Sequence, residues 1–242
     1  MIGQFLEFSL IASPLARAFD FYSALGFRPL PAGDQLPNPY VALFDGDIVI
    51  GLHDRDGPPT PQLTFVRPQL RDYVRAIRRV DIDIDDRHLA DDEFNRLAFS
   101  SPDGQAIELI EARTCSPGVW DPSNVSACGT FLEYSLPVDT TGPAQAFWSR
   151  LGFEVIAEGE ARTRWTRLKG RGLAIGLHEG HFRPGLTFRC EHLEARLEYL
   201  RAKGLEPTAG NPLSADKRHS ATLAAPEGTM LYLLDAGTQT QD

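Results

Sequence analysis

The chain contains an internal repeat, and this repeat constrains its fold more than any other feature of the sequence. The segment QFLEFSL at residues 4–10 returns as TFLEYSL at residues 130–136. Four more blocks recur in the same order: FYSALGF (21–27) as FWSRLGF (147–153), IVIGLHD (48–54) as LAIGLHE (173–179), PQLTF (61–65) as PGLTF (184–188), and SPDGQAIELIEA (101–112) as APEGTMLYLLDA (225–236). Because the matched blocks keep one order, the chain is predicted to be a duplication with one domain in each half.

Hydrophobic periodicity predicts a similar run of elements twice within each half. In the first run, a strand over 4–11 is followed by a helix that begins after Ser13-Pro14 and ends at Gly26, and then by further strands. Residues 63–111 repeat the pattern with a strand, a helix and a closing hairpin. We therefore expect an α+β fold built from four β-α-β-β-β modules.

The two expected domains cover residues 1–118 and 129–242, with a linker over 119–128. Residues 113–128 break the periodicity and include two prolines. Two of the three cysteines, Cys115 and Cys128, also fall there. An odd number of cysteines without C-x-x-C spacing favours neither a disulfide framework nor a zinc site, although one bridge between these two is conceivable.

Composition limits the partners of the chain. A formal net charge of −9 and a pI near 5.2 argue against nucleic acid or an anionic membrane, because binding to phosphate needs clustered Lys and Arg. The N-terminus lacks the basic region of a signal peptide, and no apolar stretch approaches the about 20 residues of a membrane helix. We therefore expect a cytoplasmic protein that binds neither nucleic acid nor membrane.

The first strand places polar side chains within an apolar run. Strict alternation predicts Phe5, Glu7 and Ser9 on one face of this strand and apolar side chains on the other. The apolar face suits packing against a helix. A face that combines an aromatic ring, a carboxylate and a hydroxyl suits a ligand cleft, and Glu133 takes the place of Glu7 in the second copy.

The pattern E-F-S-L-I-A-x-P-L-x-R-A-x-x-F-Y-x-x-L-G-F, followed later by S-P-D-G-x-x-I-E-L, resembles the vicinal oxygen chelate superfamily. That superfamily includes glyoxalase I, the extradiol ring-cleaving dioxygenases, and the bleomycin and fosfomycin resistance proteins. Both halves carry versions of these motifs, so the resemblance covers nearly the whole chain. It implies that each half forms a cupped, incomplete barrel around a cavity for a small organic molecule, and it leaves a homodimer open.

The resemblance also implies positions for metal ligands. In the first half these positions fall on Glu7, Gln62 and Glu108. A fourth position, at Gly51, lacks a side chain, but His53 lies on the same face of that strand. An all-oxygen set favours Mg²⁺ or Mn²⁺, and Zn²⁺, Ni²⁺ and iron are the other candidates. The set departs from the two-His, one-carboxylate triad of iron-dependent dioxygenases, so ring cleavage is not expected.

Three states remain open for Glu7 and Glu108 if they share a cavity. They bind a divalent metal, or share a proton as an acid and base pair, or are neutralised by Arg67 or Arg96 in a structural or ligand-orienting role. The catalytic candidates for a lyase or isomerase reaction are therefore Glu7, Glu108 and His53. The alternative is a protein that binds or sequesters a small molecule without catalysis, as the resistance proteins are expected to do.

The second half offers fewer donors for a metal. Its equivalent positions are Glu133, Gly185, Tyr232 and Gly176, with His178 beside the last. We expect a hydrogen bond between Glu133 and Tyr232 across adjacent strands. For both histidines the competing interpretation is a strand-end side chain that faces solvent. The substrate-binding candidates of the whole chain are Phe5, Ser9, Glu133, Tyr232 and His178.

Overall fold

A computed structural model of the protein describes residues 1–31, 39–57, 61–90, 95–112, 125–160 and 162–237. The first module contains β1 (Gln4–Ile11), α1 (Leu15–Ala24), β2 (Arg28–Pro29), β3 (Tyr40–Phe44) and β4 (Val49–His53). The second contains β5 (Gln62–Arg67), α2 (Leu70–Arg78), β6 (Asp86–His88), β7 (Arg96–Ser100) and β8 (Ala106–Glu111). The four expected modules are present in the described residues, so the predicted α+β fold is confirmed.

The second half repeats these modules. The third contains β9 (Thr130–Val138), α3 (Thr141–Arg150), β10 (Glu154–Glu160), β11 (Arg164–Lys169) and β12 (Ala174–Glu179). The fourth contains β13 (Gly185–Cys190), α4 (Leu193–Ala202), β14 (Thr208–Ala209), a short 3-10 helix (Lys217–His219), β15 (Ser220–Ala224) and β16 (Met230–Asp235). The helix α4 buries three leucines and is followed by Gly204 at φ +80°.

Each half forms one eight-stranded mixed sheet, and the strand order is the same in both. The N-terminal sheet has the order β2-β3-β4-β1-β5-β8-β7-β6, and the C-terminal sheet has the order β10-β11-β12-β9-β13-β16-β15-β14. The first strands β1 and β5 lie antiparallel at the centre, and each closing strand runs parallel to the first strand of its own module. The repeated blocks of both modules therefore meet at the centre of each sheet.

A bulge in β1 changes the face that Phe5 occupies. The register between β1 and β5 shifts between Phe5 and Glu7, so Leu6 has no partner in the ladder. The ring of Phe5 therefore lies on the apolar side, 4.9 Å from Phe8 and 5.4 Å from Phe65. The prediction that Phe5 shares a ligand-binding face with Glu7 is wrong, because strict alternation does not continue through a bulge.

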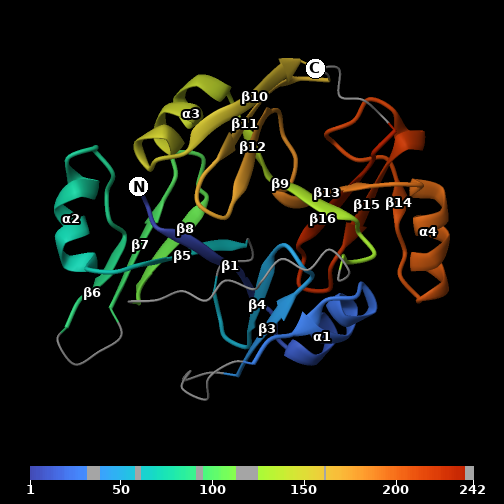
Figure 1. Ribbon diagram of the computed structural model, residues 1–242, viewed down its shortest axis with the longest axis horizontal. Coiled ribbons are helices and arrows are strands. Elements are labelled where there is room, and N and C mark those ends of the chain that lie inside the picture. The colour runs from blue at the N-terminus through green and yellow to red at the C-terminus, as the bar shows by residue number, and fades with distance from the viewer. Residues whose placement is uncertain (32–38, 58–60, 91–94, 113–124, 161, 238–242) are drawn as a thin grey trace.

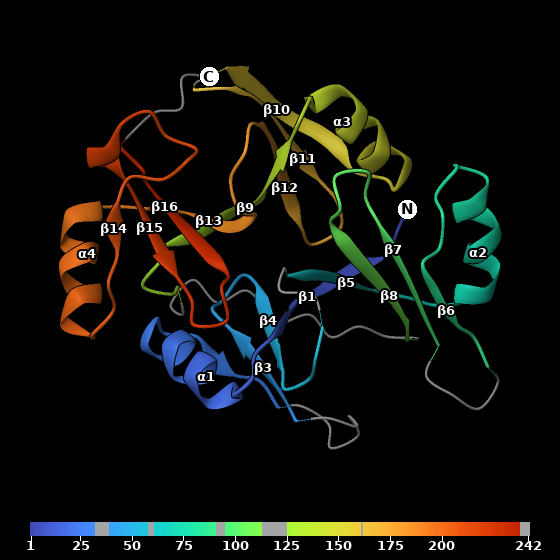
Figure 2. The ribbon, with the colours of Figure 1, turned by 180° about the vertical axis from the view of Figure 1, so that it is seen from behind.

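The two sheets share one hydrophobic core, to which both apolar faces and all four helices contribute. The ring of Phe8 lies 5.3 Å from that of Tyr134 in β9, and the Tyr134 hydroxyl donates to Gln105 Oε1 at 3.0 Å. Figures 1 and 2 show α2 and α4 at opposite ends of the molecule, with the two halves meeting between them. The face of each sheet that points away from this core is its polar face.

The expected linker falls largely outside the described residues. Its boundary at 118 and 119 lies within 113–124, so the domain limits stay a prediction. Cys115 also lies there, whereas Cys128 is a buried free thiol. Of the helices in the described ranges, none is long and apolar enough to cross a membrane.

Replacing Tyr134 by phenylalanine tests the contact between the halves. The variant leaves the buried Gln105 amide oxygen without its donor, so the free energy of unfolding should fall by about 1–2 kcal/mol. Urea unfolding measures this change, and we expect both halves to unfold in one transition. Tyr199 in α4 is 50% exposed, so Tyr199→Phe should change stability by less than about 0.5 kcal/mol. Two separate unfolding transitions would contradict a shared core.

Candidate functional site

Glu7 is a buried carboxylate at the centre of the polar face of the N-terminal sheet. The residue is 4% exposed and stands opposite Thr64 of β5. Ser9 Oγ donates to Glu7 Oε1 at 2.7 Å and lies 2.7 Å from Thr64 Oγ1. Because a buried carboxylate needs hydrogen-bond donors in place of water, the neighbouring side chains decide what Glu7 can do.

Tyr40 of β3 and His53 of β4 supply two more contacts. The Tyr40 hydroxyl donates to Glu7 Oε2, and His53 Nε2 lies 3.0 Å from Glu7 Oε1. Burial, followed by the nearby Glu7 charge, raises the pKa of Tyr40, so its hydroxyl keeps its proton and stays a donor. In the neutral His53 ring, the hydrogen bond to Glu7 assigns the proton to Nε2 and leaves Nδ1 as the basic atom.

Gly51 of β4 leaves the space that the Glu7 carboxylate occupies. A β-carbon at Gly51 would lie 2.2 Å from Glu7 Oε1, well inside van der Waals contact. The carboxylate of Glu7, on the neighbouring strand, therefore occupies the predicted ligand position at which Gly51 has no side chain. The same pairing of a glycine with a buried glutamate occurs in both copies.

We expect Gly51→Ala to lower the free energy of unfolding by about 2 kcal/mol or more, because the new methyl group displaces Glu7 from its donors. Gly142 in α3 is the matched control. A β-carbon there meets nothing within 4 Å, so Gly142→Ala should stabilise the helix by up to about 1 kcal/mol. Chemical denaturation measures both changes. Unaltered stability of Gly51→Ala would show that the Glu7 carboxylate does not lie over this glycine.

Glu108 of β8 is the second carboxylate of this face. Glu108 is paired with Thr64 in the sheet, and its strand β8 lies next to β5 on the side away from β1. Arg96 Nη1 lies 3.7 Å from Glu108 Oε1. Burial raises the pKa of Glu108 above its usual value, although the charges of Arg55 and Arg96 oppose that rise. Glu108 therefore holds a proton more readily than an exposed glutamate does.

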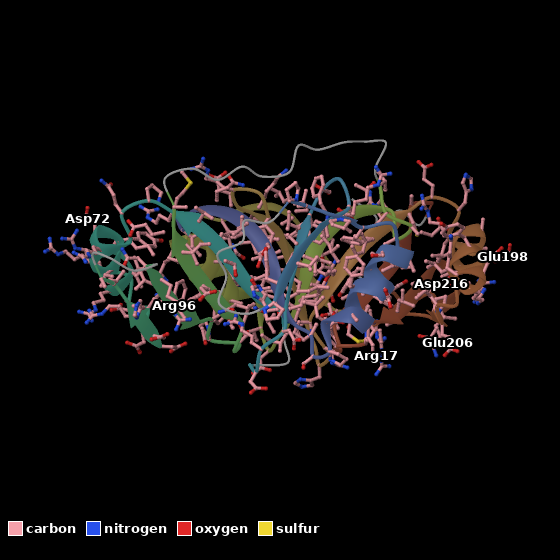
Figure 3. The ribbon with its side chains drawn as sticks, turned by 90° about the horizontal axis from the view of Figure 1, so that it is seen from below. Arg17, Asp72, Arg96, Glu198, Glu206 and Asp216 are labelled. Carbon is pink, nitrogen blue, oxygen red and sulfur yellow. The ribbon has the colours of Figure 1, made fainter. Side chains whose placement is uncertain are left out.

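Arginines engage the other oxygen atoms of this face. Arg55 Nη2 donates to Gln62 Oε1 at 3.4 Å, and Arg96 Nη2 lies 3.0 Å from Asp86 Oδ2. Figure 3 shows Arg96 toward the end of the molecule that carries α2. The expectation that Arg67 neutralises a carboxylate here is wrong, because its guanidinium lies 3.8 Å over the centre of an aromatic ring of α2.

The predicted metal ligands do not fit a divalent cation in this arrangement. Both oxygens of Glu7 already accept hydrogen bonds. Gln62 and Glu108 each contact an arginine guanidinium, whose positive charge opposes a second cation at the same oxygen. Among the described residues, no group of three or more His, Cys, Asp or Glu side chains is arranged to hold a metal ion. Metal binding stays a prediction from the sequence, and these side-chain contacts argue against it.

The C-terminal sheet repeats the centre of this network. Ser135 Oγ donates to Glu133 Oε1 at 2.9 Å and lies 2.6 Å from Thr187 Oγ1. His178 Nε2 lies 2.5 Å from Glu133 Oε1, and a β-carbon at Gly176 would lie 2.0 Å from that oxygen. The interpretation of the two histidines as solvent-facing strand ends is wrong, because each one contacts a buried carboxylate.

Arg167 of β11 makes the surroundings of Glu133 differ from those of Glu7. Its Nε donates to Glu133 Oε2 at 2.5 Å, where Tyr40 donates in the N-terminal sheet. Burial acts to raise the pKa of Glu133, but His178 and Arg167 outweigh burial and lower the pKa to about 2. Glu133 therefore stays ionised at neutral pH as part of a buried ion pair, and it is a poor proton carrier.

A row of aromatic side chains lies on the polar side of the C-terminal sheet. Four rings follow one another at centroid distances of 6.1–6.4 Å: Trp165, His178, Phe182 and Tyr232. Tyr232 lies over Gly185, and its hydroxyl donates to a backbone carbonyl at 2.6 Å. The predicted hydrogen bond between Glu133 and Tyr232 is wrong, because β13 separates β9 from β16.

Of the predicted site residues, the structure brings Glu7, Ser9 and His53 into direct contact and places Gln62 and Glu108 on nearby strands of the same sheet. Among the side chains of the two networks that were not expected are Tyr40, Arg55, Thr64 and Arg167. The threonine is shared by PQLTF and PGLTF, so the repeat contained a signal for it. The other three lie outside the repeated blocks, and no pattern in the sequence singled them out.

No family model matches the chain, and no curated protein matches it. Solved structures match it over nearly its full length. A crystal structure of catechol 2,3-dioxygenase aligns with a TM-score of 0.60 at 18% identity, covering 97% of this chain and 88% of that chain. Homoprotocatechuate 2,3-dioxygenase from Brevibacterium fuscum, in an anaerobic complex with 3,4-dihydroxyphenylacetate, aligns with a TM-score of 0.63 at 14% identity, covering 96% and 80%.

A room-temperature structure of an extradiol ring-cleaving dioxygenase from the same organism gives a TM-score of 0.62 at 14% identity, covering 96% of this chain and 71% of that chain. The chain therefore has the fold of the extradiol dioxygenases, as the sequence motifs predicted, with one eight-stranded sheet in each half. Identity this low establishes the fold alone. The chemistry depends on the side chains that this chain carries.

Proposed function

We propose that this protein binds a small organic molecule on the polar face of the N-terminal sheet and moves a proton on it, in a lyase or isomerase type of reaction. The observation that carries the proposal is the hydrogen bond between His53 and the buried Glu7. It fixes the imidazole ring and leaves Nδ1 without a hydrogen-bond partner among the described residues, as a general base requires. The His53 side chain is 17% exposed, so it is partly accessible from outside.

Each side chain has a defined role in this proposal. His53 Nδ1 accepts a proton from the bound molecule, and the carboxyl group of Glu108 donates one to a different atom of it. Glu7 holds the ring in place and stabilises the imidazolium that forms. Burial raises the pKa of Glu108 above its usual value, although the charges of Arg55 and Arg96 oppose that rise, so this carboxyl exchanges a proton closer to neutral pH than an exposed glutamate does. In an isomerisation His53 gains one proton and Glu108 loses one, so exchange with water restores both groups.

The contrast between the halves supports the N-terminal sheet as the site. In the C-terminal sheet, Arg167 and His178 hold Glu133 as an ionised carboxylate, and aromatic rings cover the face around it. The structural neighbour in complex with 3,4-dihydroxyphenylacetate supports a small organic ligand for a protein of this fold. Ring cleavage is not proposed, because the predicted ligand positions lack the two-His, one-carboxylate triad.

Exchange of substrate hydrogen for solvent deuterium tests the proposal. The protein is incubated in D₂O with a panel of small carbonyl compounds, and the loss of C–H signals is followed by proton NMR. We expect protein-dependent exchange in at least one compound. If compounds bind and none exchanges a proton, the catalytic part of the proposal fails.

The same assay tests the predicted divalent metal. It is run on chelator-treated protein and on protein supplied with Mg²⁺, Mn²⁺, Zn²⁺, Ni²⁺ or Fe²⁺, with elemental analysis of each sample. Because arginines contact Gln62 and Glu108, we expect the same exchange rate in all samples and no stoichiometric metal. A stoichiometric metal, or an exchange rate restored by one ion, would instead support the metal-dependent version.

Binding without turnover is the second candidate function. It is favoured by one observation, that both carboxylates of the face already have partners within the protein. Groups held in this way can orient a ligand without reacting with it. Stabilisation of the protein by a small organic molecule in a thermal-shift assay, without deuterium exchange, would favour this candidate.

A further inference from the structure

Arg55 carries a hydrogen-bond donor that has no partner among the residues that the structure describes. Its Nε lies buried without a hydrogen-bond partner in the described structure, and its Nη2 makes only a long bond of 3.4 Å to Gln62 Oε1. A buried donor without an acceptor destabilises a protein, so such groups are uncommon unless something else satisfies them. Arg55 follows β4 directly, two residues after His53, at the edge of the proposed site.

The two arginines of this face differ in how fully they are engaged. Arg96 pairs with Asp86 at 3.0 Å and with Glu108 at 3.7 Å. Arg55 acts on Glu108 through its charge, but no salt bridge within 4.0 Å joins it to a carboxylate in the described residues. Of these two arginines, Arg55 is therefore the one whose N–H groups are still available to bind a ligand.

The second copy has no counterpart of this arginine. The sequence H-D-R after β4 corresponds to H-E-G after β12, which puts Gly180 in the place of Arg55. Gly185 stands in the place of Gln62, and the ring of Tyr232 covers it. The N–H groups of Arg55 that are available to a ligand therefore lie in the N-terminal half, where the proposed function places the site.

We propose that the ligand of this site carries a carboxylate, which binds side-on to Nε and Nη2 of Arg55 and displaces the Gln62 amide. These two nitrogens point their N–H groups in the same direction and match the two oxygens of one carboxylate. The exchange is favourable because one long bond to a neutral amide is replaced by two bonds in which both the donor and the acceptor are charged. The inference rests on the proposed function for the location of the ligand only.

Matched acids and amides test this inference. Acetate, pyruvate and benzoate are titrated into the full-length protein, each against its primary amide, and binding is measured by ligand-observed NMR. We expect at least one acid to bind, with its amide weaker by about 10-fold or more. Arg55→Gln should weaken the acid by a similar factor, and Arg55→Lys, which keeps the charge but loses the paired donors, should fall between the two.

Arg189→Gln is the control, because this arginine of β13 is exposed in the C-terminal half, and we expect it to bind the acid like the unmodified protein. Thermal unfolding of every variant confirms that it is folded. The inference is overturned if no acid binds, if acids and amides bind equally, or if folded Arg55→Gln and Arg55→Lys both bind as well as the unmodified protein. Arg55-dependent binding of an acid without deuterium exchange would uphold the inference while the catalytic part of the proposed function fails.

Discussion

Glu133→Gln should lower the free energy of unfolding by about 3–5 kcal/mol, because removing the carboxylate leaves the Arg167 guanidinium, whose side chain is only 15% exposed, without a counter-charge. The matched variant Glu7→Gln should lower it by only about 1–2 kcal/mol, because Ser9 and Tyr40 are neutral donors. Urea unfolding at neutral pH measures both. Equal losses in the two variants would contradict the view that only the second carboxylate belongs to a buried ion pair.

The pH dependence of stability gives a second measure of Glu133. Its pKa falls from 4.5 to about 2 on folding, which corresponds to about 3 kcal/mol of stability. Since the folded-state pKa is the lower one, this stability is fully present above pH 4.5 and is lost as the pH falls through the range from 4.5 to about 2. The difference in stability between the unmodified protein and Glu133→Gln should therefore shrink when urea unfolding is repeated at pH 3.

His53→Gln should reduce deuterium exchange by about 100-fold or more, since a glutamine side chain cannot act as a general base at neutral pH. The variant keeps a group that can hydrogen-bond to Glu7, so the fold should be retained and ligand binding should change by less than the exchange rate. The measurement is the exchange assay in D₂O, with the dissociation constant determined on the same samples.

His178→Gln is the matched control for that experiment. The same histidine–glutamate contact is changed in the C-terminal sheet, where Arg167 still pairs with Glu133. We expect His178→Gln to reduce stability and to leave exchange within about 2-fold of the unmodified protein once folded protein is compared. If His178→Gln abolishes exchange and His53→Gln does not, the activity lies in the second half.

The site was only partly predictable from the sequence, and Tyr40 and Arg167 show why. Each donates to the second oxygen of a repeated glutamate, but each lies in a segment that the two copies do not share. A repeat identifies the strands that the copies have in common and says nothing of the side chains added from neighbouring strands. The prediction for Phe5 was wrong for a local reason. A bulge is a one-residue change in strand pairing, and the alternation of residue types in the sequence does not reveal it.

The sequence by itself determined the duplication, the four β-α-β-β-β modules and the delivery of one glutamate by the first strand of each half. These features follow from local periodicity and repeated order, which depend on residues close together in the chain. Only the tertiary structure decided that Glu7 meets neutral donors and a histidine whereas Glu133 meets an arginine. Such partners come from strands more than thirty residues away, and their charge sets the chemistry of each carboxylate.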